Sequence, residues 1–179
     1  MMGYIRLKQR QEQEAVSLFK KVVSLEPERF DSWYYLGFTY HSLGQFDAAV
    51  SCYNEVLARE PRHFRTHLQL GKICLALGDG VRALRHLILA REIQSNYPGV
   101  HRYLSQAQLA LGQLEAAKES AERAVQLKAD DPRAHYQLGR VLQQLGKTRE
   151  ARHQFRIADQ QQAAFRSTPQ DEAEEYSQD

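Results

Sequence analysis

Residues 33–61 read WYYLGFTYHSLGQFDAAVSCYNEVLAREP, and several positions in this stretch recur at a constant interval. Leu36, Gly37, Gly44 and Ala49 each begin a column of similar residues that repeats every 34 positions. The later members of the four columns are Leu70, Leu104 and Leu138; Gly71, Ser105 and Gly139; Gly78, Gly112 and Gly146; and Ala83, Ala117 and Ala151. Four columns in register at this period indicate a tandem repeat of helix–turn–helix units.

The glycine and alanine columns predict how each repeat folds. Two helices of about a dozen residues are expected per repeat, over roughly 31–43 and 46–59 in the first full copy. Gly44 should end the first helix, because glycine adopts the left-handed conformation without a Cβ clash. Gly37 facing Ala49 should let the paired helices approach closely, because the spacing between helix axes depends on the side chains at the contact.

This pattern resembles that of the tetratricopeptide-repeat family, which is W-x2-L-G-x2-Y, then A-x3-F, then proline. The matching residues of the first full copy are Trp33, Leu36, Gly37, Tyr40, Ala49 and Pro61, with Tyr53 in place of phenylalanine. The later copies are looser, and His67, His101 and His135 replace the tryptophan. The resemblance covers about residues 3–164. It implies an all-α fold, a right-handed α–α superhelix of the tetratricopeptide-repeat type, with four full repeats and a partial N-terminal one.

The repeat columns also predict the organisation of the chain. The full repeats are expected at 30–63, 64–97, 98–131 and 132–166, after a truncated repeat at 1–29. In the truncated copy the first helix is clipped, and Arg10 occupies the place of the turn glycine. At the other end, a helix near 148–164 carries three glutamines, Gln160 to Gln162, that are interpreted as a polar cap over the stack.

Charge is distributed unevenly along the chain. The net charge is +2, but residues up to Arg166 carry +7 and the remaining residues carry −5. The segment 167–179 is acidic and has no apolar periodicity, so it is predicted to be disordered. Two interpretations of it remain open, a solubilising end or a built-in competitor for a basic groove.

Neither catalytic nor membrane motifs are present. No phosphate loop, nucleophile elbow or zinc-protease helix occurs, so we expect a protein that is not an enzyme and needs no cofactor or metal. His67, His101 and His135 fall on successive helices, which are too far apart to share a metal, and are expected to pack in the Trp33 position. Cys52 and Cys74 form no C-x-x-C pair and are expected to be reduced thiols. Without a signal peptide or a membrane span, the expected location is the cytoplasm.

The family resemblance implies that a partner binds the concave wall made by the first helix of each repeat. The residues expected there are Tyr34, Phe38, Arg65, Leu68, Lys72, Arg102, Gln106, Arg133, Tyr136, Gln137 and Arg140. Aromatic and arginine side chains often dominate binding energies, and the basic character favours an acidic protein or peptide. Neither the carboxylate clamp of co-chaperone members nor the asparagine ladder of sugar-transferring members is matched.

Two other interpretations of the repeats remain open. The chain could be the substrate-recruiting arm of a larger enzyme or assembly, or an RNA-binding solenoid similar to the pentatricopeptide family. The modest positive charge disfavours RNA. The clipped N-terminal copy predicts an incompletely covered apolar edge at Val16, Phe19, Val22 and Val23, and therefore a monomer or a weak homodimer through that edge.

Overall fold

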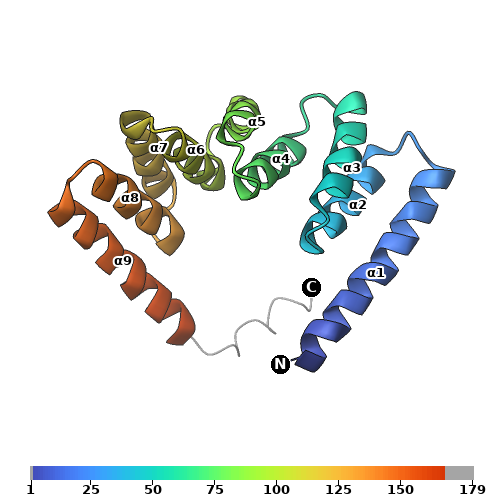
Figure 1. Ribbon diagram of the computed structural model, residues 1–179, viewed down its shortest axis with the longest axis horizontal. Coiled ribbons are helices and arrows are strands. Elements are labelled where there is room, and N and C mark those ends of the chain that lie inside the picture. Colours follow the sequence, from blue (N-terminus) through green and yellow to red (C-terminus); the bar gives the residue numbers. More distant parts are fainter. Residues whose placement is uncertain (1, 168–179) are drawn as a thin grey trace, which may run out of the picture. The chain divides into compact units, whose positions relative to one another are not determined.

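The computed structural model describes residues 2–167, with side chains for residues 11–165, and all regular structure in this range is α-helical (Figure 1). This confirms the predicted all-α class. The helices are α1 (Met2–Leu25), α2 (Phe30–Ser42), α3 (Phe46–Arg59), α4 (Phe64–Ala76), α5 (Gly80–Ile93), α6 (Pro98–Ala110), α7 (Leu114–Leu127), α8 (Pro132–Gln144) and α9 (Thr148–Ser167). They form two compact units, residues 1–95 and 96–179, called here the first and second unit.

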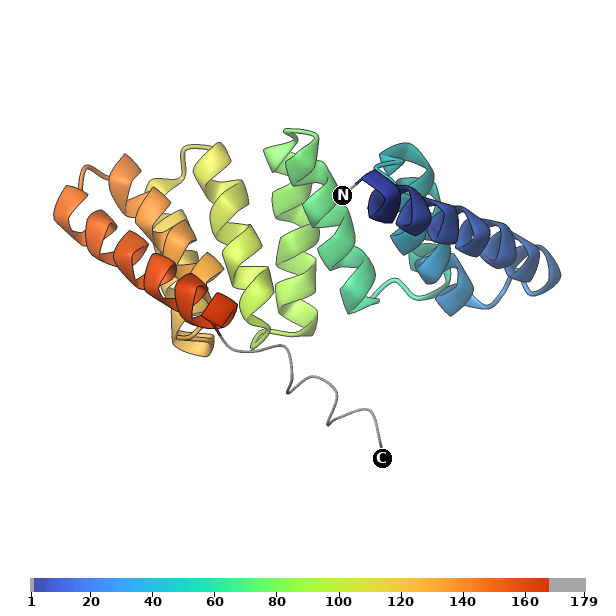
Figure 2. The same ribbon diagram turned by 90° about the horizontal axis from the view of Figure 1, so that it is seen from below.

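Each unit is built from antiparallel helix pairs. In the first unit α2 pairs with α3 and α4 with α5, while α1 packs on α2. In the second unit α6 pairs with α7 and α8 with α9, and α8 also packs on α6 and α7 (Figures 1 and 2). The predicted ranges 31–43 and 46–59 agree with α2 and α3 to within one residue.

The turn inside each pair requires its glycine. Gly44, Gly78, Gly112 and Gly146 have φ values of 72°, 76°, 72° and 74°, in the left-handed region. Around Gly44, the backbone N–H of Gln45 donates to the carbonyl of Tyr40 at 2.9 Å, and that of Gly44 donates to His41 at 3.0 Å. This is the Schellman arrangement, which satisfies the last carbonyls of a helix. The predicted role of the turn glycine is confirmed.

The second glycine column makes its closest contacts with large side chains of the second helix. A Cβ atom added at Gly37 would lie 2.9 Å from the ring of Tyr53, and one added at Gly71 would lie 2.6 Å from Leu87. At Gly139 it would meet the ring of Phe155 at 2.6 Å. The closest approach is therefore made against the column four residues beyond Ala49, with Cβ of Cys52 also 3.1 Å from the added atom at Gly37. The contact of Gly37 with Ala49 stays a prediction.

The α6–α7 pair is packed with different residue types at the same two positions. Ser105 stands in the glycine column and Ala121 in the column of Tyr53 and Leu87, and both are completely buried. A small alanine on α7 leaves room for a serine side chain on α6, so neither helix of this pair carries a large side chain at the contact.

Side chains of the Trp33 column tie each first helix to the preceding loop. Nε1 of Trp33 donates to the carbonyl of Pro27 at 2.8 Å. Nε2 of His67 and of His135 each lie 2.9 Å from the carbonyl oxygen of the residue six positions earlier, Pro61 or Ala129. Because a carbonyl only accepts, each ring nitrogen must carry a proton. Histidine thus replaces tryptophan as a donor as well as a space-filling ring.

The N-terminal copy of the repeat forms one continuous helix. α1 runs through Arg10, since no glycine or proline stands near this turn position to end it. Val16, Phe19 and Val22 are half-buried, as expected for an incompletely covered edge, whereas Val23 is buried at 7% exposure within the core. The expectation for Val23 was therefore wrong.

The last helix is longer than the predicted 148–164 and is bonded to the unit beneath it. Nε2 of Gln161 donates to the carbonyl of Ala129 at 2.7 Å, linking α9 to the α7–α8 connection. The acidic stretch 168–179 lies outside the described residues.

Candidate partner-binding pocket

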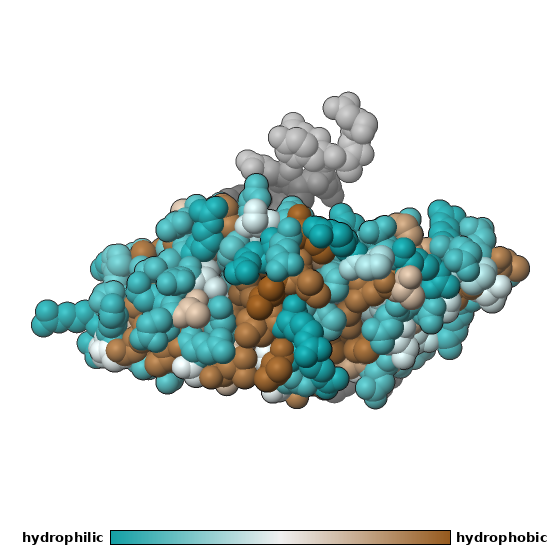
Figure 3. Space-filling model, turned by 90° about the horizontal axis from the view of Figure 1, so that it is seen from above, coloured by the Kyte–Doolittle hydropathy of each residue, from teal (hydrophilic) through white to brown (hydrophobic). Residues whose placement is uncertain are grey.

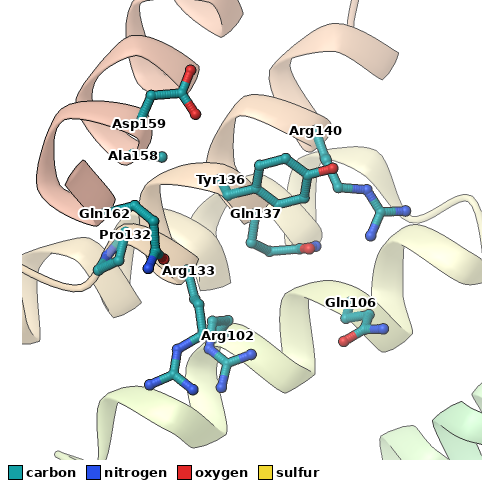
Figure 4. Close-up of a pocket in the computed structure, with 10 residues that line it drawn as sticks. All are labelled: Arg102, Gln106, Pro132, Arg133, Tyr136, Gln137, Arg140, Ala158, Asp159 and Gln162. Atoms are coloured by element: carbon teal, nitrogen blue, oxygen red, sulfur yellow. The ribbon is translucent and has the colours of Figure 1, made fainter. Parts of the chain in front are cut away.

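A cavity of about 330 Å³ opens in the second unit between α6, α8 and α9 (Figure 4). Six of the eleven residues expected on the binding wall line it. The full lining, called here the arginine pocket, is Arg102, Gln106, Pro132, Arg133, Tyr136, Gln137, Arg140, Ala158, Asp159 and Gln162.

Helical spacing brings these side chains together. Arg133, Tyr136, Gln137 and Arg140 follow an i, i+3, i+4, i+7 pattern and so share one face of α8. The start of that helix is fixed by Asp131, whose Oδ1 accepts a hydrogen bond from the backbone N–H of Arg133 at 3.0 Å. The pocket is therefore presented by a capped, well-defined helix rather than by a loop.

Arg102 is the most constrained of the three arginines. Its guanidinium lies 4.3 Å from the centroid of the Tyr103 ring, a cation–π geometry. Its Nε atom is buried and has no hydrogen-bond partner among the described residues. A buried donor without a partner is costly, and more so on a charged group. Because solvent does not reach Nε, an acceptor in the pocket would meet the terminal nitrogens of the Arg102 guanidinium.

The pocket carries an excess of positive charge. Arg133 reaches Asp131 only at 3.4 Å with a side chain that is 75% exposed, so this ion pair is weak. Arg140 is exposed, and Asp159 is the single acid among the lining residues. In Figure 4 the guanidinium groups of Arg102 and Arg133 lie on one side of the pocket and that of Arg140 on the other. Arginines around a cleft favour an anionic ligand.

The floor and one wall of the pocket are held by packing. Gln137 is 5% exposed, and its Nε2 donates to Oγ of Ser105 at 3.2 Å. Tyr136 is 56% exposed, and its ring centroid lies 5.5 Å from that of Phe155. The serine of the glycine column thus positions a pocket glutamine, while Tyr136 presents an aromatic surface to a ligand.

Sequence analysis missed the contribution of α9. Ala158, Asp159 and Gln162 line the pocket from the last helix, and Pro132 lines it from the start of α8. The polar 160–162 run was interpreted only as a cap. The available signal was that Ala158 and Gln162 are four residues apart and so share a face of the helix.

The five predicted residues of the first unit are not all accessible. Phe38 is 45% exposed and Arg65 is exposed, while Nζ of Lys72 donates to Oε1 of Gln69 at 2.9 Å. Tyr34 and Leu68 are buried, with exposures of 8% and 9%. For these two the expectation of a partner-facing side chain was wrong.

Aromatic packing explains why Tyr34 is buried. Its ring centroid lies 5.2 Å from that of His63, in the loop before α4, and 5.9 Å from that of Tyr53 on α3. The ring therefore fills the space between neighbouring repeats of the first unit. A large aromatic residue on the first helix of a repeat serves the core here, although its position in the sequence pattern suggested a ligand contact.

The buried histidines have local partners. Nδ1 of His67 lies 3.2 Å from Nδ1 of His86, and Nδ1 of His135 lies 2.7 Å from Oε1 of Gln154. Burial, together with the neighbouring His67, lowers the pKa of His86 to about 4. Within the described part of the chain, no three His, Cys, Asp or Glu side chains are grouped as a metal would require.

Both cysteines are free and buried. Burial raises the pKa of the Cys52 thiol to about 11 and also raises that of Cys74. Protonated, buried thiols are poor nucleophiles, so neither side chain has the character of a catalytic cysteine.

Comparison with protein families accounts for most of the chain. Patterns described as tetratricopeptide repeat match residues 1–29, 30–63 and 65–87, and a pattern described as TPR repeat matches residues 106–146. The chain belongs to the tetratricopeptide-repeat family. The four matches show a protein-interaction repeat module, and members of this family are typically non-catalytic scaffolds.

Solved structures support the tetratricopeptide-repeat solenoid fold. MamA from Desulfovibrio magneticus RS-1 is 21% identical with a TM-score of 0.81, covering 91% of this chain and 92% of that one. A thermophilic TPR protein from Thermus thermophilus is 23% identical with a TM-score of 0.69, covering 89% and 88%. PilF from Pseudomonas aeruginosa is 20% identical with a TM-score of 0.76, covering 89% and 73%. No match was found among curated protein sequences.

Hydropathy gives one further result for this tetratricopeptide-repeat chain. Among the helices described, none combines the length and apolar character needed to cross a bilayer. On the face shown in Figure 3, hydrophobic residues lie in small groups separated by hydrophilic ones.

Proposed function

We propose that the protein is a non-catalytic interaction module that binds an extended acidic segment of a protein partner in the arginine pocket. The observation that supports this most directly is that Arg102, whose buried Nε has no hydrogen-bond partner among the described residues, lines a cavity together with two further arginines. A carboxylate supplies both the acceptor and the charge that this arrangement lacks.

The other lining residues suit the rest of such a segment. Arginine binds carboxylates through paired N–H donors, so Arg102 and Arg140 can hold two acidic side chains on opposite sides of the pocket. Tyr136 offers an apolar surface for an aliphatic or aromatic residue between them. The side-chain amides of Gln106 and Gln162 can donate to, or accept from, the backbone of an extended chain.

The proposed compartment is the cytoplasm. Cys52 and Cys74 are unpaired and their pKa values are raised by burial, which suits a reducing environment.

The test is a binding titration with a labelled synthetic peptide rich in glutamate and carrying one tyrosine. Fluorescence anisotropy with the full-length chain should give a saturable curve, and Arg102→Gln with Arg140→Gln should weaken binding at least about tenfold, a change of about 1.4 kcal/mol. The matched control is Arg149→Gln with Arg152→Gln, which removes the same charge from exposed α9 positions outside the pocket. Equal weakening in both variants would show a diffuse charge effect and contradict the proposal.

The same titration with single-stranded RNA separates protein binding from nucleic-acid binding. Phosphate-driven affinity falls steeply with salt. RNA binding that is tighter than peptide binding and strongly salt-dependent would replace the proposed partner class.

A further inference from the structure

We propose that the acidic segment of this same chain, residues 171–175, occupies the arginine pocket when no partner is bound. This inference rests on the proposed function, because the occupant and the partner segment would share one site. Its sequence, Asp171-Glu172-Ala173-Glu174-Glu175, supplies four carboxylates and no base.

Charge complementarity is the first reason. The pocket has three arginines against Asp159, and the segment 167–179 carries −5. Arg102 lines the pocket with few partners for its guanidinium, and no ion pair joins Arg140 to a carboxylate in the described part of the chain. Carboxylates at i and i+3 or i+4 of the segment can reach arginines on both sides of the pocket.

Reach is the second reason. Gln162 lines the pocket and α9 ends at Ser167, five residues later, which is about 7.5 Å along a helix axis. The four residues from Ser167 to Asp171 can span about 13 Å when extended. The first acidic residue can therefore turn back past Gln162 without any change in the helices.

A continuous path is the third reason. A second cavity of about 400 Å³ adjoins the arginine pocket and shares Pro132, Arg133 and Gln162 with it. It extends to Phe165, in the last turn of α9, and also includes Lys128. Asp130 and Asp131 also line it, and Asp131 is engaged in capping α8. A chain leaving α9 thus finds a hollow that leads past two basic side chains to Arg102.

Tethering makes even a weak contact effective. A short tether keeps the segment at a local concentration on the order of 1 mM. If its intrinsic dissociation constant is about 0.1 mM, about nine tenths of the pockets are occupied, and a competing peptide binds about tenfold more weakly than to an empty pocket. A partner must then bind tightly enough to overcome this tenfold loss of affinity before it can displace the segment.

The experiment uses the full-length chain and a variant with Asp171→Asn, Glu172→Gln, Glu174→Gln and Glu175→Gln. The probe is a labelled synthetic peptide of residues 168–179, and binding is followed by fluorescence anisotropy. The variant should bind the probe about tenfold more tightly than the unchanged chain, and adding Arg102→Gln and Arg140→Gln should abolish this gain. The control pair Arg149→Gln and Arg152→Gln should leave the gain intact.

Nuclear magnetic resonance provides a second readout in the absence of probe. The Nε–H signal of Arg102 should shift between the unchanged chain and the neutralised variant. Equal probe affinity for both chains, with no shift of this signal, would overturn the inference. If both chains nevertheless bind the glutamate-rich peptide through Arg102 and Arg140, the proposed function stands. If neither peptide depends on these arginines, both proposals fail.

Discussion

The α2–α3 pair of the first unit and the α6–α7 pair of the second have the same turn and the same period, yet their interfaces are filled in opposite ways. In the first, Gly37 makes room for the ring of Tyr53. In the second, Ala121 makes room for Ser105. The two positions are therefore coupled: a large side chain on the second helix accompanies glycine on the first, and a serine on the first accompanies alanine on the second.

The difference has a consequence for the binding face. A glycine has no side chain that can form a hydrogen bond, whereas Oγ of Ser105 accepts a hydrogen bond from Nε2 of Gln137 at 3.2 Å. The second unit therefore holds a polar side chain in place beneath its pocket. In the first unit the corresponding glutamine, Gln69, is also buried, but glycine stands in the place of the serine and Oε1 of Gln69 accepts from Nζ of Lys72 at 2.9 Å.

The largest expected effect comes from filling the glycine of the first unit. Gly37→Leu should lower the free energy of unfolding by about 3 kcal/mol, because its side chain must displace the ring of Tyr53. Urea denaturation measures the change. In a Tyr53→Ala background the same substitution should cost markedly less, since the clash is removed. An equal cost in both backgrounds would show that Tyr53 is not the partner.

Giving the α6–α7 pair the glycine and large side chain found in the first unit tests directly whether the two positions are coupled. Ala121→Leu should destabilise by about 2 kcal/mol through overpacking against Ser105. Combining it with Ser105→Gly recreates the Gly71–Leu87 arrangement and should recover part of the loss, as shown by a double-mutant cycle. Strict additivity of the two substitutions would contradict the comparison.

The turns should respond alike in both units, because their geometry is the same. Gly44→Ala and Gly112→Ala should each cost about 1–2 kcal/mol, since alanine is strained at the observed φ of 72°. No atom lies within 4 Å of the added methyl at either glycine, so the effect is conformational rather than steric. Denaturant midpoints that differ clearly between the two variants would argue against a common turn.

The smallest effect concerns acid sensitivity of the first unit. His86, beside His67, Arg82 and Arg85, has a pKa lowered to about 4 from 6.5. The unfolded chain therefore takes up this proton first, so stability is full above about pH 6.5 and falls as the pH drops toward 4. Partial exposure should keep the loss below about 1 kcal/mol. His86→Gln, which copies the Gln154 position of the second unit, should reduce the loss in urea denaturation across this pH range.

The repeat period and the turn glycines could be predicted from the sequence because they depend on local backbone geometry. The closest neighbour of Gly37 could not, because the crossing of the two helices decides which side chain of α3 lies nearest to it. Tyr34 and Leu68 were misplaced for the same reason, since exposure depends on neighbouring repeats. Six pocket residues were expected from the concave wall that the family resemblance implies, while Asp159 and Gln162 required knowledge of how α9 lies against α8.

The bonds from Trp33, His67 and His135 to the loops before them have a mechanical consequence. Each bond bridges six residues and closes the connection that joins one repeat to the next. A chain stretched from its two ends would load these bonds before the connections could straighten. The force needed to lengthen the chain should therefore depend on how strongly these ring nitrogens hold the loops that they bond.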